Sequence, residues 1–326
     1  MILKRALAAS CCVALLLGGS IARAAEPAAS IVIRAGKADS PNYALARQFA
    51  EAVAVAVNGA YTLVVQESQG SVQNVIDAAK TQRNYVFTAS PDLIAEARRG
   101  QKPFAPNAHY RDIRALFPIP AQTVHWIVRQ DSGIAGLKDL AGRSFISGAK
   151  GSVAERVTTT ALQTLGIDRQ VQIMDIAAAA APAALKAKQV SGIALAGAYP
   201  LPAVLDLASG LPVRLLGLPK PELAKVLAAD ETVAAEIVPK SAYPGMEADV
   251  TTLAVPAGVF TTLHMPAATA YAITKAFWSQ HAALAAKNPP WDAVGAASLA
   301  TLKVKLHKGA LRYYREQRMA VPKAMR

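Results

Sequence analysis

Short runs of β-branched and aromatic residues alternate along the chain with longer segments rich in alanine and leucine. This alternation predicts an α/β fold with a largely parallel sheet, because each strand of such a sheet is followed by a covering helix. Three strand–helix units come first. Their strands are expected at 31–34, 61–66 and 85–88, and their helices begin at Pro41 or span 71–82 and 90–99.

A second series of elements follows a loop at 101–111 that contains two prolines. Extended segments are predicted at 113–117 and 123–129, and the second of these is expected to cross to another lobe. Further on, the pattern predicts strands at 143–147, 170–175 and 192–196. Each is followed by a predicted helix, at 152–165, at 177–188 and from about Pro200. The apolar run 253–260 can carry the chain back, and helices at 266–281 and 308–319 close the molecule.

The N-terminal residues have the pattern of an export signal. Lys4 and Arg5 precede an apolar stretch at 6–19, and Ala22-Arg23-Ala24 fits a small-x-small cleavage site. We therefore expect export to the periplasm with cleavage near Ala24, and no later run reaches the roughly 20 apolar residues of a spanning helix. Both cysteines fall inside this signal. A mature chain without thiols excludes thiolate catalysis, zinc–thiolate sites, iron–sulfur clusters and disulfides.

The length of the chain indicates two lobes, because a single core stops growing near 250 to 300 residues. We expect lobe 1 to contain residues 25–120 and 259–326 and lobe 2 to contain residues 121–258. The chain then crosses twice between the lobes, and two such crossings form a hinge that can close around a ligand.

The charge of the protein is strongly positive, at +13 for the whole chain, and falls to +10 once Lys4, Arg5 and Arg23 are removed. This charge fits an anionic solute or adsorption to anionic surfaces. The alternative is a solvated basic surface, since the Lys and Arg residues are scattered. No nucleic-acid-binding module is present.

Catalytic and metal-binding motifs are missing from the sequence. No HExxH, Walker loop, GxGxxG or GxSxG occurs, and the histidines have no metal-ligand spacing: His109, His125, His264, His281 and His307. The sequence therefore predicts no catalytic residue, no metal and no cofactor.

Small polar residues follow the predicted strands at the turns into helices, where open α/β sheets bind ligands. In the turn 147–152, free backbone amides and the helix dipole favour an anion, with Lys150, Gly151 and Ser152 as candidate contacts. Alternatively, Ser152 only caps the helix. The other candidate contacts, whose alternative roles are capping, turn formation or core packing, are Ser40, Asn42, Tyr43, Ser71, Asn74, Ser90, Phe117 and Tyr199.

In order and spacing, these turns resemble the solute receptors of the TAXI branch of TRAP (tripartite ATP-independent periplasmic) transporters. The resemblance runs from Ile31 to the end of the chain. The matching segments are Gly70-Ser71 with Asn74, 128–134, 148–152 with Glu155, 200–204, 250–256 and 306–316.

The resemblance implies a type II-like periplasmic binding protein fold with a hinge and a central ligand cleft. It further implies a monomer without a cofactor that captures a carboxylate or an amino acid and delivers it to membrane TRAP subunits. By position, the ligand would contact the turn after the first strand, residues 70–74, Ser90, Gly151, Ser152 and Tyr199.

The sequence departs from the family pattern at three places. Residues 37–41 replace a glycine-rich turn, Ile119 stands where members often have an acidic residue, and Phe117 replaces Tyr. These changes predict a solute that is less charged or more apolar than glutamate. Two other functions remain open: a sensor subunit of the same fold that signals to a membrane kinase, and an exported hydrolase, which the missing nucleophile motifs disfavour.

Overall fold

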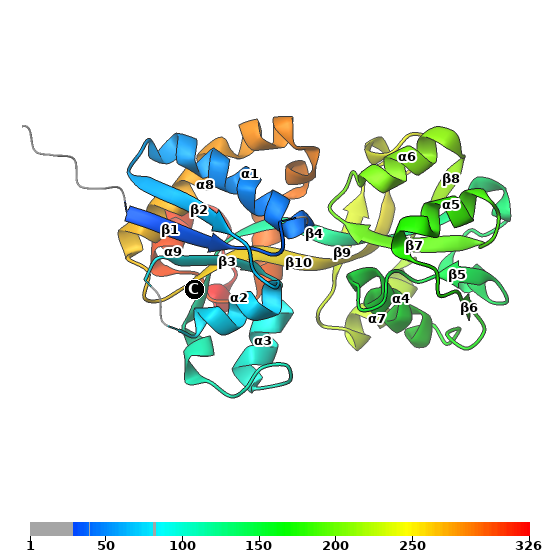
Figure 1. Ribbon diagram of the computed structural model, residues 1–326, viewed down its shortest axis with the longest axis horizontal. Coiled ribbons are helices and arrows are strands. Elements are labelled where there is room, and N and C mark those ends of the chain that lie inside the picture. The colour runs from blue at the N-terminus through cyan, green and yellow to red at the C-terminus, as the bar shows by residue number, and fades with distance from the viewer. Residues whose placement is uncertain (1–28, 39, 81–82) are drawn as a thin grey trace, which may run out of the picture.

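The computed structural model describes residues 29–38, 40–80 and 83–326, so the predicted signal at 1–24 lies outside the described residues. Two α/β lobes lie side by side and are joined by two long antiparallel strands, β4 (Ile113–Arg129) and β10 (Val250–Thr262) (Figure 1). No helix in the described part of the chain is long and apolar enough to span a membrane.

Lobe 1 is built on the parallel strands β1 (Ala29–Arg34), β2 (Tyr61–Gln66) and β3 (Tyr85–Ala89), in the order β2-β1-β3. One face of this sheet is covered by α1 (Pro41–Val57) and α8 (Ala267–Lys287), and the other by α2 (Ser71–Ala78) and α3 (Pro91–Arg99) (Figure 1). The C-terminal helix α9 (Lys308–Glu316) packs on α8.

Lobe 2 contains the parallel strands β5 (Ser144–Ile146), β6 (Gln172–Ile173) and β7 (Gly192–Gly197). Two further strands, β8 (Val213–Leu216) and β9 (Ala234–Val238), pair with β4 and β10. The helices α4 (Val153–Thr164) and α7 (Lys220–Ala229) share one hydrophobic cluster, and α5 (Ala181–Lys186) and α6 (Pro202–Gly210) share another.

The hydrophobic core divides where β4 and β10 pass between the lobes. The core of lobe 1 includes Ile119 and Ala257, whereas the core of lobe 2 begins at Val124 and extends to Val255. Only a short stretch of each strand therefore lies between the two cores.

The structure corrects the predicted break between 117 and 123, because β4 is a single strand through Pro118 and Pro120. Proline cannot donate to a ladder and is confined to edges and bulges. Both conditions hold here: the pairing of β4 with β10 shifts register between Val255 and Ala257, and β7 pairs with β4 only from Thr123 onward.

Other predictions on lobe 2 were less accurate. The strand predicted at 170–175 shrinks to β6, the helix predicted at 177–188 shrinks to α5, and β8, α7 and β9 were not predicted. The sheet is mixed rather than largely parallel, because β4 runs antiparallel to β7, β8 and β10. Strands that cross between lobes do not follow the strand–helix rule on which the prediction was based.

Candidate functional site

A cavity of about 300 Å³ lies between the lobes beside the crossing strands. This volume is at the small end of the range for ligand pockets. The helix starts of lobe 1, the crossing strands and the start of α4 in lobe 2 all contribute to its lining: Asn42, Ser71, Thr88, Ala89, Ser90, Asp92, Leu93, Ile119, Gln122, Gly151, Val153, Arg156, Val255, Pro256 and Ala257. We call this cavity the interlobe cleft.

The strand order of lobe 1 determines where the cleft lies. The chain passes from β1 to β2 on one side and then to β3 on the other, so the connections diverge at the carboxyl ends of β1 and β3. Open α/β sheets bind ligands at such a switch point. The starts of α1, α2 and α3 converge there, which brings together Asn42, Ser71 and Ser90.

The side chain of Asn74 connects two strands at this edge of the sheet without lining the cleft. Its side chain is fully buried, and Nδ2 donates to the carbonyl oxygens of Ala35 (2.7 Å) and Thr88 (3.1 Å). These bonds connect the ends of β1 and β3. Asn74 was predicted to contact the ligand, but it does not line the cleft, and its amide positions the strands that do.

Unsatisfied polar groups mark the lobe 1 side of the cleft. Oγ1 of Thr88 and Oδ1 of Asp92 are buried and have no hydrogen-bond partner among the described residues. Ser90, at the start of α3, makes no capping bond with its hydroxyl, and α2 begins after Gly70 without a side-chain cap. Buried polar groups are normally paired, so these groups are suited to a bound partner.

A guanidinium group faces this edge from lobe 2. Nη1 of Arg156 donates to Oδ2 of Asp230 at 2.9 Å and to Oγ1 of Thr232 at 2.8 Å, while its side chain stays 42% exposed. Burial and the nearby Asp92 raise the pKa of Glu96 on α3, and the charges of Arg99 and Arg156 oppose this rise. The charge of Arg156 thus acts across the cleft on lobe 1.

The predicted anion turn at 147–152 is organised mainly by its own helix. The Ser152 hydroxyl accepts from the Glu155 amide at 3.2 Å and so caps α4, and the Gly151 amide donates to the Glu155 carboxylate. Gly148 has a φ of +125°, and a Cβ there would lie 2.7 Å from the Glu155 nitrogen. Lys150 is exposed and does not line the cleft. Of this turn, Gly151 lines the cleft.

Phe117 requires a correction, because the structure places it in the core of lobe 1 and not at the cleft. It is fully buried and stacks on Phe277 with a centroid separation of 4.0 Å and an interplanar angle of 7°. Its ring also meets Phe49 edge-on. The side chain of Ile119, two residues along β4, lines the cleft instead.

Three other predicted contacts lie outside the interlobe cleft. Ser40 caps α1 by accepting from the Tyr43 amide, and the Tyr43 ring packs against the core of lobe 1. The Tyr199 hydroxyl donates to Oε1 of Glu236 and to the Ile237 carbonyl, both at 3.2 Å, in a separate hollow. That second hollow shares Ile119, Pro256 and Ala257, but not the unpaired groups, with the cleft.

Sequence reasoning missed four polar residues of the cleft. Thr88 and Asp92 belong to the predicted third turn, where only Ser90 was selected, and Gln122 lies in the crossing segment. Arg156 was not selected, because in the sequence it is only one charged residue of a predicted helix. It lies four residues after Ser152, so it is one turn into α4 on the same face as the capping residue. This spacing was the signal that could have identified it.

Comparison with solved structures identifies the fold. A TctC solute-binding protein from Polaromonas matches with a TM-score of 0.53 and 15% identity, over 90% of this chain and 99% of that one. The aliphatic sulphonate-binding protein SsuA of Escherichia coli matches with a TM-score of 0.46 and 14% identity, over 91% and 96%. MatC of Rhodopseudomonas palustris, solved with malate, matches at 0.47 and 12%, over 85% and 90%.

The first of these likenesses shows that the chain has the two-lobed α/β fold of a periplasmic solute-binding protein. At the level of sequence, the model of the NMT1-like family matches residues 33–317. Since this range includes both lobes and the crossing strands, the chain belongs to the NMT1-like family.

Proposed function

We propose that the protein is an exported receptor that binds a small carboxylate-bearing solute in the interlobe cleft and does no chemistry on it. One observation carries the proposal: Oγ1 of Thr88 and Oδ1 of Asp92 are buried and unpaired, among the described residues, at a cavity that both lobes line. Leaving such groups unpaired costs about 1 to 3 kcal/mol each. A ligand that pairs with them would recover this energy.

The arrangement of donors and acceptors narrows the class of solute. The uncapped starts of α2 and α3 and the hydroxyls of Ser71 and Ser90 are donors suited to a carboxylate. Asp92 needs a donor in return, which an α-ammonium group supplies. We therefore favour an amino acid over a dicarboxylate, with an apolar side chain against Ile119 and Val255.

Hinge closure is the proposed mechanism of capture. The Arg156 hydrogen bonds within the described chain use Nη1 alone, which leaves Nη2 and Nε for a ligand carboxylate. A solute held by the helix starts of lobe 1 would thereby draw Arg156 and lobe 2 toward it. Bending of β4 and β10 between the two cores allows this movement.

Delivery to the membrane subunits of a TRAP transporter of the TAXI type is the proposed outcome of capture. The order of the turns from Gly70 to the C-terminal segment 306–316 supports this assignment, and the segment 1–24 supports export to the periplasm. We propose that the receptor acts as a monomer without a cofactor.

Binding can be tested by thermal shift on refolded protein starting at Ala25, followed by calorimetry. A panel of amino acids, dicarboxylates with four to six carbons, 2-oxoacids and aromatic acids would be screened, since a ligand specific for the folded state raises the melting temperature. We expect an amino acid to bind, to remain unaltered after incubation, and to reduce the radius of gyration in solution scattering. Turnover of the solute, or binding without compaction, would contradict the proposal.

Matched variants locate the site once a ligand is known. Ser71→Ala in lobe 1 and Arg156→Gln in lobe 2 should each weaken binding by about 10-fold, as expected for a hydrogen bond to a charged group. Lys150→Ala is the control, since Lys150 is exposed and outside the lining. A loss of affinity in the control alone would move the site to the turn 147–152.

The transporter assignment needs a separate measurement. Uptake of the identified solute by intact cells should fall when the gene is deleted and when the ion gradient is collapsed. Uptake that depends on ATP instead would exclude a TRAP partner, while leaving the receptor proposal in place.

A further inference from the structure

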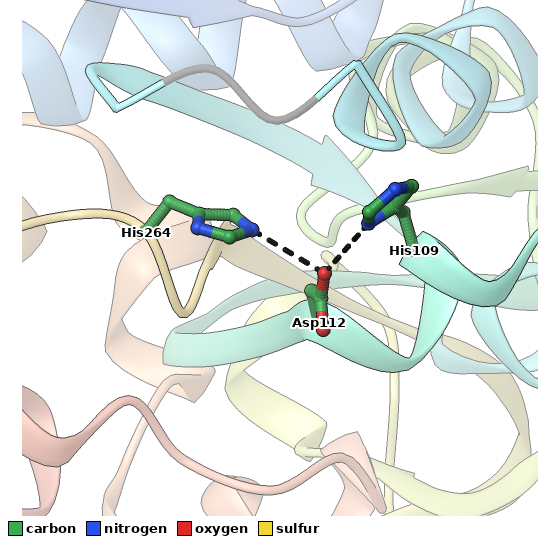
Figure 2. A group of neighbouring side chains, drawn as sticks. All are labelled: His109, Asp112 and His264. Carbon is green, nitrogen blue, oxygen red and sulfur yellow. Dashed lines mark hydrogen bonds and ion pairs between the residues drawn. The ribbon is translucent and has the colours of Figure 1, made fainter.

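Two neighbouring side chains, His109 and Asp112, meet the distant His264 at the outer end of lobe 1. Oδ2 of Asp112 lies 3.0 Å from Nδ1 of His109 and 3.3 Å from Nε2 of His264, and both rings point at this one oxygen (Figure 2). One ligand atom from each residue lies within 4.8 Å of the other two. We call these three residues the His–Asp–His cluster.

The backbone holds the cluster in place through the ends of the two crossing strands. Ile113 pairs with Thr262 in the ladder, and the amide of Leu263 donates to the Asp112 carbonyl at 2.8 Å. Asp112 and His264 are therefore positioned by a ladder with a buried core beneath it. His109 lies three residues before Asp112 in a short 3₁₀ helix, Ala108–Asp112, where residues at this spacing eclipse one another.

The two separations from Oδ2 of Asp112 to the imidazole nitrogens match the distance between neighbouring ligands of one metal ion. With metal–ligand bonds of about 2.0 to 2.1 Å, adjacent ligand atoms lie about 2.9 Å apart in octahedral and about 3.4 Å apart in tetrahedral geometry. The observed 3.0 and 3.3 Å fall within this interval. An ion can thus replace the two hydrogen bonds if side-chain rotation brings the two imidazole nitrogens, which lie within 4.8 Å of each other, to ligand spacing.

We propose that the His–Asp–His cluster binds a divalent transition-metal ion of the zinc class. Two imidazole nitrogens and one carboxylate oxygen suit Zn²⁺ and its neighbours rather than Mg²⁺ or Ca²⁺, which prefer oxygen ligands.

The exposure of the cluster permits the ion to enter. The side chain of His109 is 53% exposed and that of His264 is 34% exposed, while Asp112 is 22% exposed. The nitrogen proton that each ring now donates to Asp112 can move through water to the other ring nitrogen, which frees a lone pair. Water would fill the remaining coordination positions.

The site is independent of the interlobe cleft. The cleft borders the carboxyl end of β3 at Thr88 and Ala89, whereas the cluster lies where β10 passes the opposite end of that strand, beside Tyr85. A bound ion would tie the segment before β4 to the segment after β10. The expected effect is stabilisation of lobe 1.

The test is calorimetric titration of tag-free protein starting at Ala25 with zinc chloride, and with cobalt chloride read by visible absorption. One ion per chain is expected. His109→Gln and Asp112→Asn should each weaken binding by more than about 10-fold, the lower end of what loss of even an outer-shell partner costs. The control is His281→Gln, because His281 bonds the Trp291 carbonyl away from the cluster.

His109→Gln is the decisive variant, because a half-exposed side chain can be changed without disturbing the core. Circular dichroism would verify that each variant is folded. If the wild-type protein shows no saturable binding of either ion, or if His109→Gln and His281→Gln bind as tightly as wild type, the proposed site does not exist.

Discussion

Replacement of Thr88 by valine should strengthen the fold and weaken ligand binding at the same time. Thr88 is 1% exposed, lies near the carboxyl end of the buried strand β3, and carries a hydroxyl without a partner among the described residues. Valine has nearly the same shape and suits a strand. The substitution therefore removes an unpaired polar atom without opening a cavity.

The size of both effects follows from this environment. A buried hydroxyl without a partner costs about 1 to 3 kcal/mol, so ligand-free Thr88→Val should gain stability in this range. For a lobe of this size, each kcal/mol raises the melting temperature by about 2 to 4 °C. The lost hydrogen bond to a carboxylate should weaken binding by about 10-fold or more.

Thr261→Val is the matched control. Thr261 is also fully buried in a strand of lobe 1, but its hydroxyl donates to the Tyr85 carbonyl at 2.7 Å. Its loss should lower stability by about 1 kcal/mol and leave ligand affinity unchanged.

Urea unfolding of ligand-stripped protein and calorimetry with the identified solute would measure these quantities. Opposite signs of the two stability changes are the expected result. If Thr88→Val is no more stable than wild type and binds the solute equally well, the hydroxyl is not a ligand group and the reasoning on the cleft is wrong.

Three further predictions concern the scaffold. Gly148→Ala should lower the free energy of unfolding by about 2 to 4 kcal/mol, because a Cβ there would meet a backbone nitrogen of α4 at 2.7 Å. Gly151→Ala should lower it by only about 1 kcal/mol, because a Cβ there has open space around it. Urea unfolding would measure both changes. Equal losses would show that the turn adapts. Gly309→Ala should destabilise the protein although alanine favours helices, because its Cβ would press on the carbonyl oxygen of Ala267 in α8; a higher melting temperature would contradict this packing. Burial lowers the pKa of His125 to about 4, against a backbone hydrogen bond that raises it. The folded protein keeps this ring neutral where the unfolded chain protonates it, so stability should fall as pH drops from about 6.5 toward 4, by about 2 kcal/mol at pH 5. His125→Gln should reduce this slope in urea unfolding at several pH values, and an unchanged slope would refute the assignment.

The strand–helix units of lobe 1 were predictable because each depends on residues close together in the sequence. The repeat of Leu45, Phe49, Val53 and Val57 predicts one apolar face of the helix α1. The first three are buried, and Val57 is partly buried against the same core. The cap of α4 by Ser152 is likewise legible in the sequence, since its hydrogen bond to the Glu155 amide spans three residues. In lobe 2, the short β6 and α5 lack such repeats, and their extents were overestimated.

Part of the candidate site was also predictable, because the carboxyl ends of parallel strands meet at one edge. Asn42, Ser71, Ser90 and Gly151 line the interlobe cleft together, as their positions at turns suggested. The position of the cleft along the crossing strand was not predictable. Phe117 and Ile119 are two residues apart and point to the same face of β4, but Phe117 lies inside the core of lobe 1 and Ile119 lines the cleft.

By itself, the sequence determined the alternation of elements, the need for two lobes and the set of turns from which a ligand site could be built. Only the tertiary structure decided which of those turns share a cavity, that Asn74 supports the site from behind, and that His109 and His264 converge on Asp112. The physical reason is the range of the interactions. Periodicity and capping act over a few residues, whereas strand pairing such as that of Ile113 with Thr262 joins positions that no local pattern relates.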